Sequence, residues 1–255
     1  GPMVRRLFLP QENQLWAAND FSAQEPRLLV HYANLLQLEG AEKMASAYRD
    51  NPDTDFHRMV ADMAGDSVSR KAAKVIGLGI MYGMGKKKLA TQLDLSVEEA
   101  SELIQDFHQR VPFLRGTVHA VQKKIEHPAS GGAIRTLLGR KCRFPLWEPQ
   151  KWGINKALPY EEAYAKYGAR IKRAMTYKGL NRLIQGSASD QCKRALVELH
   201  KAGFDIMLQV HDEIALSVKD RKEAEDAAEI MREAVQLDVP SKVDVEIGES
   251  WGDAC

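Results

Sequence analysis

The chain has 255 residues, of which 44% are hydrophobic and 28% charged, a composition typical of soluble globular proteins. Its 36 Lys and Arg nearly balance its 35 Asp and Glu, so net charge gives no indication of a polyanionic partner. No apolar run approaches the roughly 18 residues that a membrane span needs. Three cysteines without paired spacing (Cys142, Cys192 and Cys255) favour reduced thiols in a cytosol. Gly1-Pro2 before Met3 is typical of a cleavage scar, so we expect the native chain to start at Met3.

The predicted elements begin with a short apolar strand that ends in an acid, at Gln14–Phe21. A helix with proline near its first turn follows over Pro26–Leu38. A long helical region then runs from about Asp55 to His127, interrupted by Gly, Asp and Pro. Gly131–Pro145 is predicted to form a basic hairpin or extended loop, and helix returns over Pro159–Ala202.

The hydrophobic period then changes from helical to alternating. Asp205–Val218 is predicted to be a β-hairpin, Arg221–Gln236 an amphipathic helix and Lys242–Ile247 a final strand. This order of elements predicts an α+β fold, in which a small antiparallel sheet carries a helical insertion.

Two adjacent carboxylates interrupt the predicted hairpin. Asp212 and Glu213 are flanked by apolar strand residues, where a charge is costly unless a cation or hydrogen-bond donors satisfy it. A simple turn explains the spacing equally well, because Asp is a common turn residue. Asp20 also ends an apolar strand. Two strand-end carboxylates suit Mg²⁺, which binds a few carboxylates and keeps positions for water and phosphate oxygens.

One predicted helix carries a regular stripe. Arg70, Lys74, Leu78 and Tyr82 recur every four residues and therefore follow one slowly rotating line along the helix. In an arbitrary helix such a stripe is usually a solvated basic face followed by core contacts. Next to a polyphosphate, the same stripe could bind phosphate groups.

Several motifs in order resemble those of the family A (DNA polymerase I-like) DNA polymerases. The matching segments are Asp20–Arg27 (motif A), Arg70–Gly85 (motif B), Gln209–Ile214 (motif C), Asn181–Gly186 (N-x-x-x-Q-G) and Asp55–Arg58 (D-x-H-R). The resemblance extends from Arg5 to Cys255. Because the motifs occur together and in order, it is far more specific than any one of them alone.

The resemblance implies a polymerase right hand that lacks its thumb and exonuclease domains. It assigns residues 3–32 to the palm, 33–190 to the fingers and a helical region, and 191–255 to the palm again. Thumb contacts to phosphates supply much of the affinity for DNA, so we expect this chain to bind primer-template weakly by itself. An N-terminal polymerase fragment that supplies the thumb is therefore an expected partner.

The resemblance also implies a two-metal centre. Asp20 and Asp212 would hold two Mg²⁺ ions, the backbone carbonyl of Phe21 would be a further ligand, and Glu213 would support them. One ion would lower the pKa of the primer 3′-hydroxyl, and the other would bridge the incoming triphosphate.

The stripe then acquires implied roles in nucleotide binding. Arg70 and Lys74 would grip the triphosphate of a dNTP, and Lys74 would also protonate the leaving group. Leu78, in place of the usual aromatic residue, would pack on the nucleotide, and Tyr82 would face the templating base. His57 would contact the triphosphate, although alone it would more simply be a surface histidine.

Other residues are implied to select the sugar and bind DNA. Glu25 would exclude a ribose 2′-hydroxyl, although a glutamate near a helix N-terminus is also favoured by the macrodipole. Asn181, Gln185 and His211 would contact the minor groove and the primer end. Arg140 would contact the DNA backbone, unless its basic cluster is merely solvated.

Two functions therefore remain open. The first is a DNA-templated DNA polymerase, either a truncation or the product of a split gene, in the cytosol of a bacterium or a phage-infected cell. The second is a catalytically silent fragment of a split polymerase that binds DNA or a partner chain. Glu25 disfavours a third, an RNA polymerase of the same superfamily.

Overall fold

The computed structural model describes residues 2–65, 68–151, 153 and 156–254. Gly1 of the predicted scar and Cys255 lie outside the described residues, whereas Cys142 and Cys192 are free thiols. The chain forms two compact units. Unit 1 comprises residues 1–35, 43–54 and 185–255, and unit 2 comprises residues 36–42 and 55–184.

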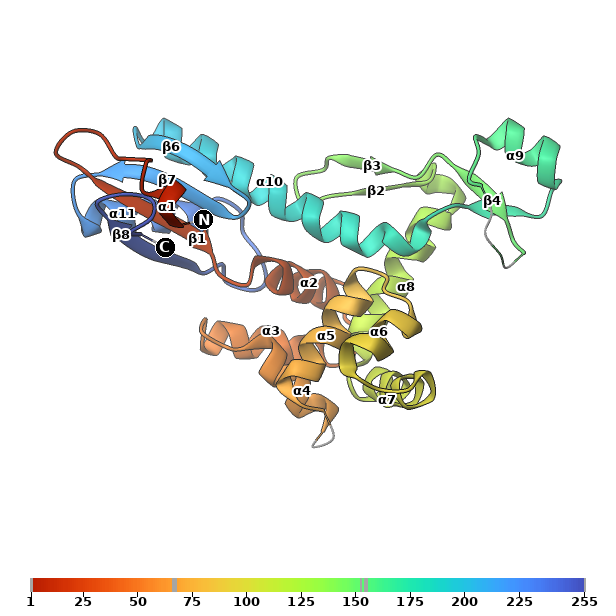
Figure 1. The fold of residues 1–255 in the computed structure, drawn as a ribbon. Coiled ribbons are helices and arrows are strands. Elements are labelled where there is room, and N and C mark those ends of the chain that lie inside the picture. Colours follow the sequence, from red (N-terminus) through yellow and green to blue (C-terminus); the bar gives the residue numbers. More distant parts are fainter. Residues whose placement is uncertain (1, 66–67, 152, 154–155, 255) are drawn as a thin grey trace. The chain divides into compact units, whose positions relative to one another are not determined.

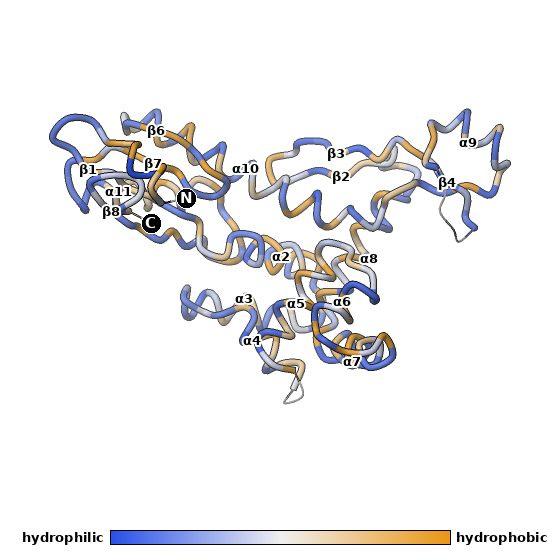
Figure 2. The backbone as a smooth tube through the Cα atoms, viewed as in Figure 1, coloured by the Kyte–Doolittle hydropathy of each residue, from blue (hydrophilic) through white to orange (hydrophobic). Residues whose placement is uncertain are grey.

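Unit 1 is built on a four-stranded antiparallel sheet (Figure 1). Its strand order is β6-β7-β1-β8, so β1 is an interior strand that pairs with both β7 and β8. The strands are β1 (Leu15–Phe21), β6 (Asp205–Val210), β7 (Glu213–Val218) and β8 (Val243–Gly248). The predicted strand, hairpin and final strand are confirmed. In Figure 2, β6 and β7 are largely hydrophobic, whereas the loop leading into β1 is hydrophilic.

Helices cover one face of this sheet. Apolar side chains of β1, β7 and β8 pack against α11 (Arg221–Glu233) and against the part of α10 (Gly179–Lys201) that belongs to unit 1. Phe21, Leu199 and Met231 are among the buried members of this core. The remaining helices of the unit are α1 (Pro2–Arg5), α2 (Gln24–Leu35) and most of α3 (Ala41–Asp50).

The opposite face of the sheet carries a smaller apolar cluster. Trp16 and Ala18 of β1 and Ala215 of β7 pack there with Ala254, and the Trp251 ring stacks on Trp16 with centroids 6.3 Å apart. Side chains alternate along a strand, so Asp20 shares this face with Trp16 and Ala18. Trp251 and Ala254 therefore cover this face of the sheet next to Asp20.

Unit 2 contains five consecutive helices, in the region where long interrupted helix is predicted. The helices are α4 (Phe56–Ala64), α5 (Arg70–Met81), α6 (Lys86–Leu93), α7 (Val97–Arg110) and α8 (Pro112–Glu126). Three of them, α4, α5 and α7, start at a residue whose side chain caps the helix. Asp55 accepts a hydrogen bond from the Arg58 N–H, and Ser96 forms a reciprocal capping box with Glu99.

The rest of unit 2 consists of short elements. The predicted basic hairpin is formed by β2 and β3, and a second antiparallel pair is formed by β4 and β5. These elements are η1 (Pro128–Ser130), β2 (Ala133–Arg135), β3 (Lys141–Arg143), β4 (Trp147–Pro149), α9 (Tyr160–Tyr167), β5 (Ile171–Arg173) and η2 (Thr176–Lys178).

The prediction of helix over Pro159–Ala202 is partly wrong. Helix α9 ends at Tyr167, because Gly168 adopts a positive φ of 71° that stops it. Strand β5 follows and pairs with β4, and Met175 at φ 60° makes a further turn before α10 begins at Gly179. Among the described helices, none is both long enough and apolar enough to cross a membrane.

Candidate active site

Four carboxylates converge at one end of the unit 1 sheet. Asp20, near the end of β1, lies directly opposite Glu213 on β7 and Asp244 on β8. Directly paired residues project to the same face of a sheet. The Phe21 N–H donates to the Asp212 carbonyl at 3.3 Å, so the hairpin turn lies beside the end of β1. The structure therefore gathers the predicted Asp20, Asp212 and Glu213, and adds Asp244.

This cluster changes the proton affinity of Asp20. The pKa of Asp20 is raised from an ordinary 3.8 to about 6, chiefly by burial and then by the negative charges of Asp212, Glu213 and Asp244 and a side-chain hydrogen bond with Asp212. Asp20 is only half-buried, so water and ions can reach it. Excess negative charge at an accessible point favours a bound cation.

The donor set is suited to a hard cation that keeps most of its water. Within the described ranges, no group of three or more His, Cys, Asp or Glu side chains is placed so that it could hold a metal ion. Asp20 and Asp212 approach closely enough to share a hydrogen bond, whereas Glu213 accepts one from the Trp251 indole at 2.8 Å. Two oxygen donors with open positions fit Mg²⁺ better than a metal that needs four protein ligands.

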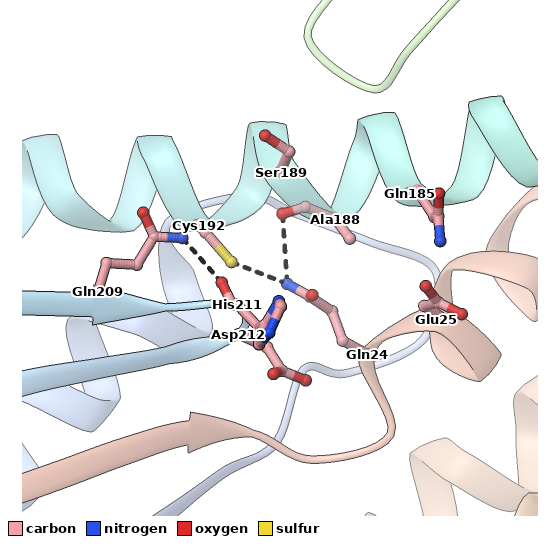
Figure 3. Close-up of a pocket in the computed structure, with 9 residues that line it drawn as sticks. All are labelled: Gln24, Glu25, Gln185, Ala188, Ser189, Cys192, Gln209, His211 and Asp212. Atoms are coloured by element: carbon pink, nitrogen blue, oxygen red, sulfur yellow. Dashed lines mark hydrogen bonds between the residues drawn. The ribbon is translucent and has the colours of Figure 1, made fainter. Parts of the chain in front are cut away.

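A cleft of about 610 Å³ adjoins this cluster (Figure 3). Three segments form it: the start of α2, the unit 1 part of α10 and the hairpin turn. Figure 3 shows Glu25 and Gln185 at one end and Asp212 near the middle. The lining residues are Gln24, Glu25, Gln185, Ala188, Ser189, Cys192, Gln209, His211 and Asp212. Four predicted site residues of unit 1 thus share one cleft.

The turn at His211 is held in an uncommon conformation. His211 has a φ of 57°, which is rare for residues other than glycine, and its carbonyl accepts a hydrogen bond of 2.7 Å from the Gln209 amide. This bond stabilises the turn that orients Asp212. Strained residues of this kind often occur at functional sites.

Gln24 is a site residue to which the sequence assigned no role. Its buried amide Nε2 donates to the Ala188 carbonyl at 3.4 Å, to Gln191 Oε1 at 3.1 Å and to Cys192 Sγ at 3.4 Å. Gln191 in turn donates to Ser241 Oγ at 2.8 Å. This network fixes the start of α2 against α10. No pattern in the sequence could identify it, because its partners lie more than 160 residues away.

Arg27 positions the segment that follows Asp20. The residue is 3% exposed, and its guanidinium donates to three backbone carbonyls, those of Ser22 at 2.9 Å, Pro240 at 2.7 Å and Pro52 at 2.5 Å. It also lies 4.4 Å from the centroid of the Tyr48 ring. Arg27 therefore connects its own segment to the backbone at Pro52 and at Pro240.

We expect Arg27→Met to lower the free energy of unfolding by about 3 kcal/mol, because three backbone carbonyls lose their charged donor. Chemical denaturation measures this change. Arg49→Met is the matched control: Arg49 also donates to a backbone carbonyl, that of Asp238, but is exposed. Its loss should be within about 0.5 kcal/mol. Equal losses in the two variants would contradict the tethering role.

In unit 2, the predicted stripe lies on the accessible face of α5. Arg70, Lys74 and Tyr82 are exposed and Leu78 is half-buried, whereas the opposite face packs into the unit. Ser69 caps the helix through the Ala72 N–H, and Tyr82 is its last capping residue. The stripe is therefore available to a ligand.

His57 joins this stripe at its N-terminal end. Burial lowers the pKa of His57, and the positive charges of Lys74 and Arg70 lower it further. The negative charge of Asp55 acts in the opposite direction and raises this pKa. Arg70 Nε lies 2.6 Å from Asp55 Oδ2. His57 Nδ1 is buried and has no hydrogen-bond partner among the described residues. Three predicted triphosphate contacts, His57, Arg70 and Lys74, thus lie within electrostatic reach of each other.

The remaining predicted DNA contacts lie in two places. Asn181 is half-buried on the unit 2 part of α10, and Arg140 is exposed in the turn of the β2–β3 hairpin. Gln185 and His211 belong to unit 1. Within unit 1, Gln185 and His211 line the same cleft, shown in Figure 3.

Comparison with known proteins places these motifs in a family. A family model described as DNA polymerase family A matches residues 1–253. The DNA-directed DNA polymerase of Pseudomonas phage M6 is 41% identical, covering 98% of this chain and 40% of the phage protein. The thermostable DNA polymerase I of Thermus aquaticus is 32% identical, covering 98% of this chain and 28% of that protein.

A solved structure gives the same answer for the fold. The POL domain of Pol1 from M. smegmatis, in complex with DNA primer-template and dNTP, matches with a TM-score of 0.75 and 28% identity. The match covers 99% of this chain and 43% of that one. The chain thus spans less than half the length of these relatives.

Proposed function

The chain belongs to DNA polymerase family A, and on that premise we propose that it carries out DNA-templated transfer of a nucleotide from a dNTP to a primer 3′-hydroxyl. The observation that carries this proposal is the convergence of Asp20, Asp212 and Glu213 beside an open cleft. The solved relative holds primer-template and dNTP, which supports the same partners here.

Members of this family use divalent metals, and the carboxylate pair described above fits two Mg²⁺ ions. Asp20 and Asp212 would hold them together with the Phe21 carbonyl. When bound, the ions would lower the pKa of the attacking hydroxyl and neutralise the leaving pyrophosphate. Glu213 keeps a supporting role, because the Trp251 indole already holds its carboxylate.

In this proposal, side chains of α5 and His57 of α4 bind the incoming nucleotide. Arg70 and Lys74 bind its oxygens, and His57, with its lowered pKa, donates or accepts a hydrogen bond without adding charge. Lys74 delivers a proton to the departing pyrophosphate oxygen as the bond to the α-phosphorus breaks. Leu78 packs on the nucleotide and Tyr82 faces the templating base.

In this proposal, the unit 1 cleft binds the sugar of the dNTP and the end of the primer. Glu25 excludes the 2′-hydroxyl of a ribonucleotide, while Gln185 and His211 contact the primer end. Asn181 and Arg140 contribute further DNA contacts. We infer that unit 1 contains the palm, predicted as residues 3–32 and 191–255, and that unit 2 contains most of the fingers and helical region, predicted as 33–190; residues 43–54 of that region belong to unit 1. A thumb-bearing partner fragment and a location in the cytosol of a bacterium or a phage-infected cell belong to the same proposal.

Primer extension with Mg²⁺ tests this function. The chain is assayed alone and with a separately produced N-terminal fragment of a family A polymerase that carries the thumb. We expect extension in at least the second condition, and expect Asp212→Asn to abolish it. Asp226→Asn, which removes an exposed aspartate on α11, is the matched control and should leave extension unchanged.

The alternative predicts a different result. If the folded chain extends no primer in either condition but still binds DNA or the partner fragment, it is a catalytically silent binding fragment. Extension that survives Asp212→Asn would contradict the proposed metal centre.

A further inference from the structure

A group of aromatic side chains lies on the surface of unit 2, outside every role proposed above. Tyr160 and Tyr164 are 46% and 49% exposed and lie one turn apart on α9. Their ring centroids are 6.1 Å apart with planes inclined by 32°, and the Trp147 ring meets Tyr160 edge-on at 5.2 Å. Neighbouring exposed aromatic rings on a soluble domain commonly mark a binding surface.

A small hydrophobic core lies beneath these rings. Trp147 and Tyr167 pack against a small core of Leu158, Ala163 and Ile171. Because these residues belong to β4, α9, β5 and the segment before α9, this core fixes the helix to the strand pair. Rings held on a rigid base lose little conformational entropy when a ligand binds.

Arg173 also holds Trp147 in place. It lies directly opposite Trp147 in the strand pair, and its guanidinium carbon is 4.6 Å from the Trp147 ring centroid. Its Nη1 also donates to the Phe144 carbonyl at 3.0 Å. Trp147 is therefore occupied as a support, which leaves the faces of Tyr160 and Tyr164 for a ligand.

The charge of this region favours an anion. Residues 147–173 include six Lys or Arg and three Glu, an excess of three positive charges. Lys166 is an exposed residue of α9 whose Nζ lies 5.4 Å from the Tyr167 ring. The Tyr167 hydroxyl donates to the Lys156 carbonyl at 3.3 Å, so the backbone of a second exposed lysine lies beside the same helix. The acidic residues Glu161 and Glu162 occupy the first turn of α9, where the macrodipole favours them.

Exposed rings next to positive charge suit single-stranded nucleic acid. Unpaired bases stack on aromatic side chains whatever their sequence, while lysines attract the phosphates. Bases in a duplex are already stacked on each other and cannot present their faces in this way. A purely apolar partner would not favour tyrosine hydroxyls beside lysines.

We infer that Tyr160 and Tyr164 form a stacking platform for the bases of single-stranded DNA. If the proposed function holds, that strand is the unpaired template. The identity of the strand rests on the proposed function, whereas the binding itself does not.

Fluorescence anisotropy of a labelled oligothymidylate, with the whole chain and without dNTP, tests the platform. Replacing both rings (Tyr160→Ala with Tyr164→Ala) should weaken binding about tenfold or more, because both stacking contacts with bases are lost. The matched double variant, Tyr160→Phe with Tyr164→Phe, keeps the rings and should bind as the unchanged chain does.

Unchanged affinity in the double alanine variant would overturn the inference, as would an equal loss in the double phenylalanine variant. A duplex of the same length should compete poorly; equal competition would also overturn it. If the double alanine variant does not keep its thermal midpoint, Tyr164→Ala alone provides the measurement. The anisotropy measurement uses no metal, primer or dNTP, so a failure of the catalytic proposal is distinguishable from a failure of the platform.

Discussion

Asp20→Asn should abolish primer extension and, in the absence of metal, make the folded chain more stable above about pH 6. Both effects have one cause. The carboxylate that would hold the cation is, without it, a half-buried negative charge next to Asp212, Glu213 and Asp244. Asparagine nearly matches its shape and removes the charge, so the variant loses the metal ligand and the repulsion together.

The sign of the pH dependence follows from the raised pKa. Because the folded chain releases the Asp20 proton at about pH 6 and the unfolded chain releases it near 3.8, the folded state binds more protons between these values. Stability of the unchanged chain therefore falls as the pH rises through this window and levels off above it. The advantage of Asp20→Asn should be absent below about pH 4, grow up to about pH 6 and then stay constant.

Thermal unfolding in a chelator, measured from pH 4 to pH 8, checks this prediction. Added Mg²⁺ should raise the midpoint of the unchanged chain and not that of the variant, because a ligand that binds only the folded state stabilises it. Asp226→Asn serves again as the control and should behave as the unchanged chain does. A variant that is less stable than the unchanged chain at pH 8 would show that Asp20 is not a strained carboxylate.

Sequence alone predicted the strands of unit 1 well, because each has a strong local signal. β1 and the β6–β7 hairpin combine alternating or continuous apolar residues with an acid at the end. The acids Asp20 and Asp212 could also be singled out, since charge at the end of an apolar strand is unusual. Their meeting in space could not be predicted from spacing and came from the family resemblance.

Other features depend on contacts between distant residues. Asp244 is one of two acids on an amphipathic strand, and only the register of β8 against β1 brings it opposite Asp20. Gln24 matters because of where α10 lies. The interruption of the predicted helix after Tyr167 involves a strand of only three residues, too short for a period to be recognised.

Lys74→Met should lower the rate of nucleotide transfer by about 10²–10⁴-fold, the usual contribution of a positioned general acid. Lys74 is exposed on the accessible face of α5 and lies close enough to His57 to depress its pKa. If its main role is proton delivery, single-turnover rates should fall much more than the affinity for dNTP. Methionine keeps the length and apolar contacts of the lysine stem, so α5 should remain folded.

The neighbouring Lys71→Met provides the matched control. Lys71 is an exposed lysine on the same helix but lies off the stripe, so its loss should change the rate by less than about twofold if nonspecific charge is unimportant. Nuclear magnetic resonance titration of His57 gives a readout independent of activity. Removing the Lys74 charge should raise the pKa of His57, because that charge holds it down, whereas Lys71→Met should leave it unchanged. A rise in the His57 pKa with an unchanged transfer rate would place Lys74 beside the triphosphate site without a role in proton transfer.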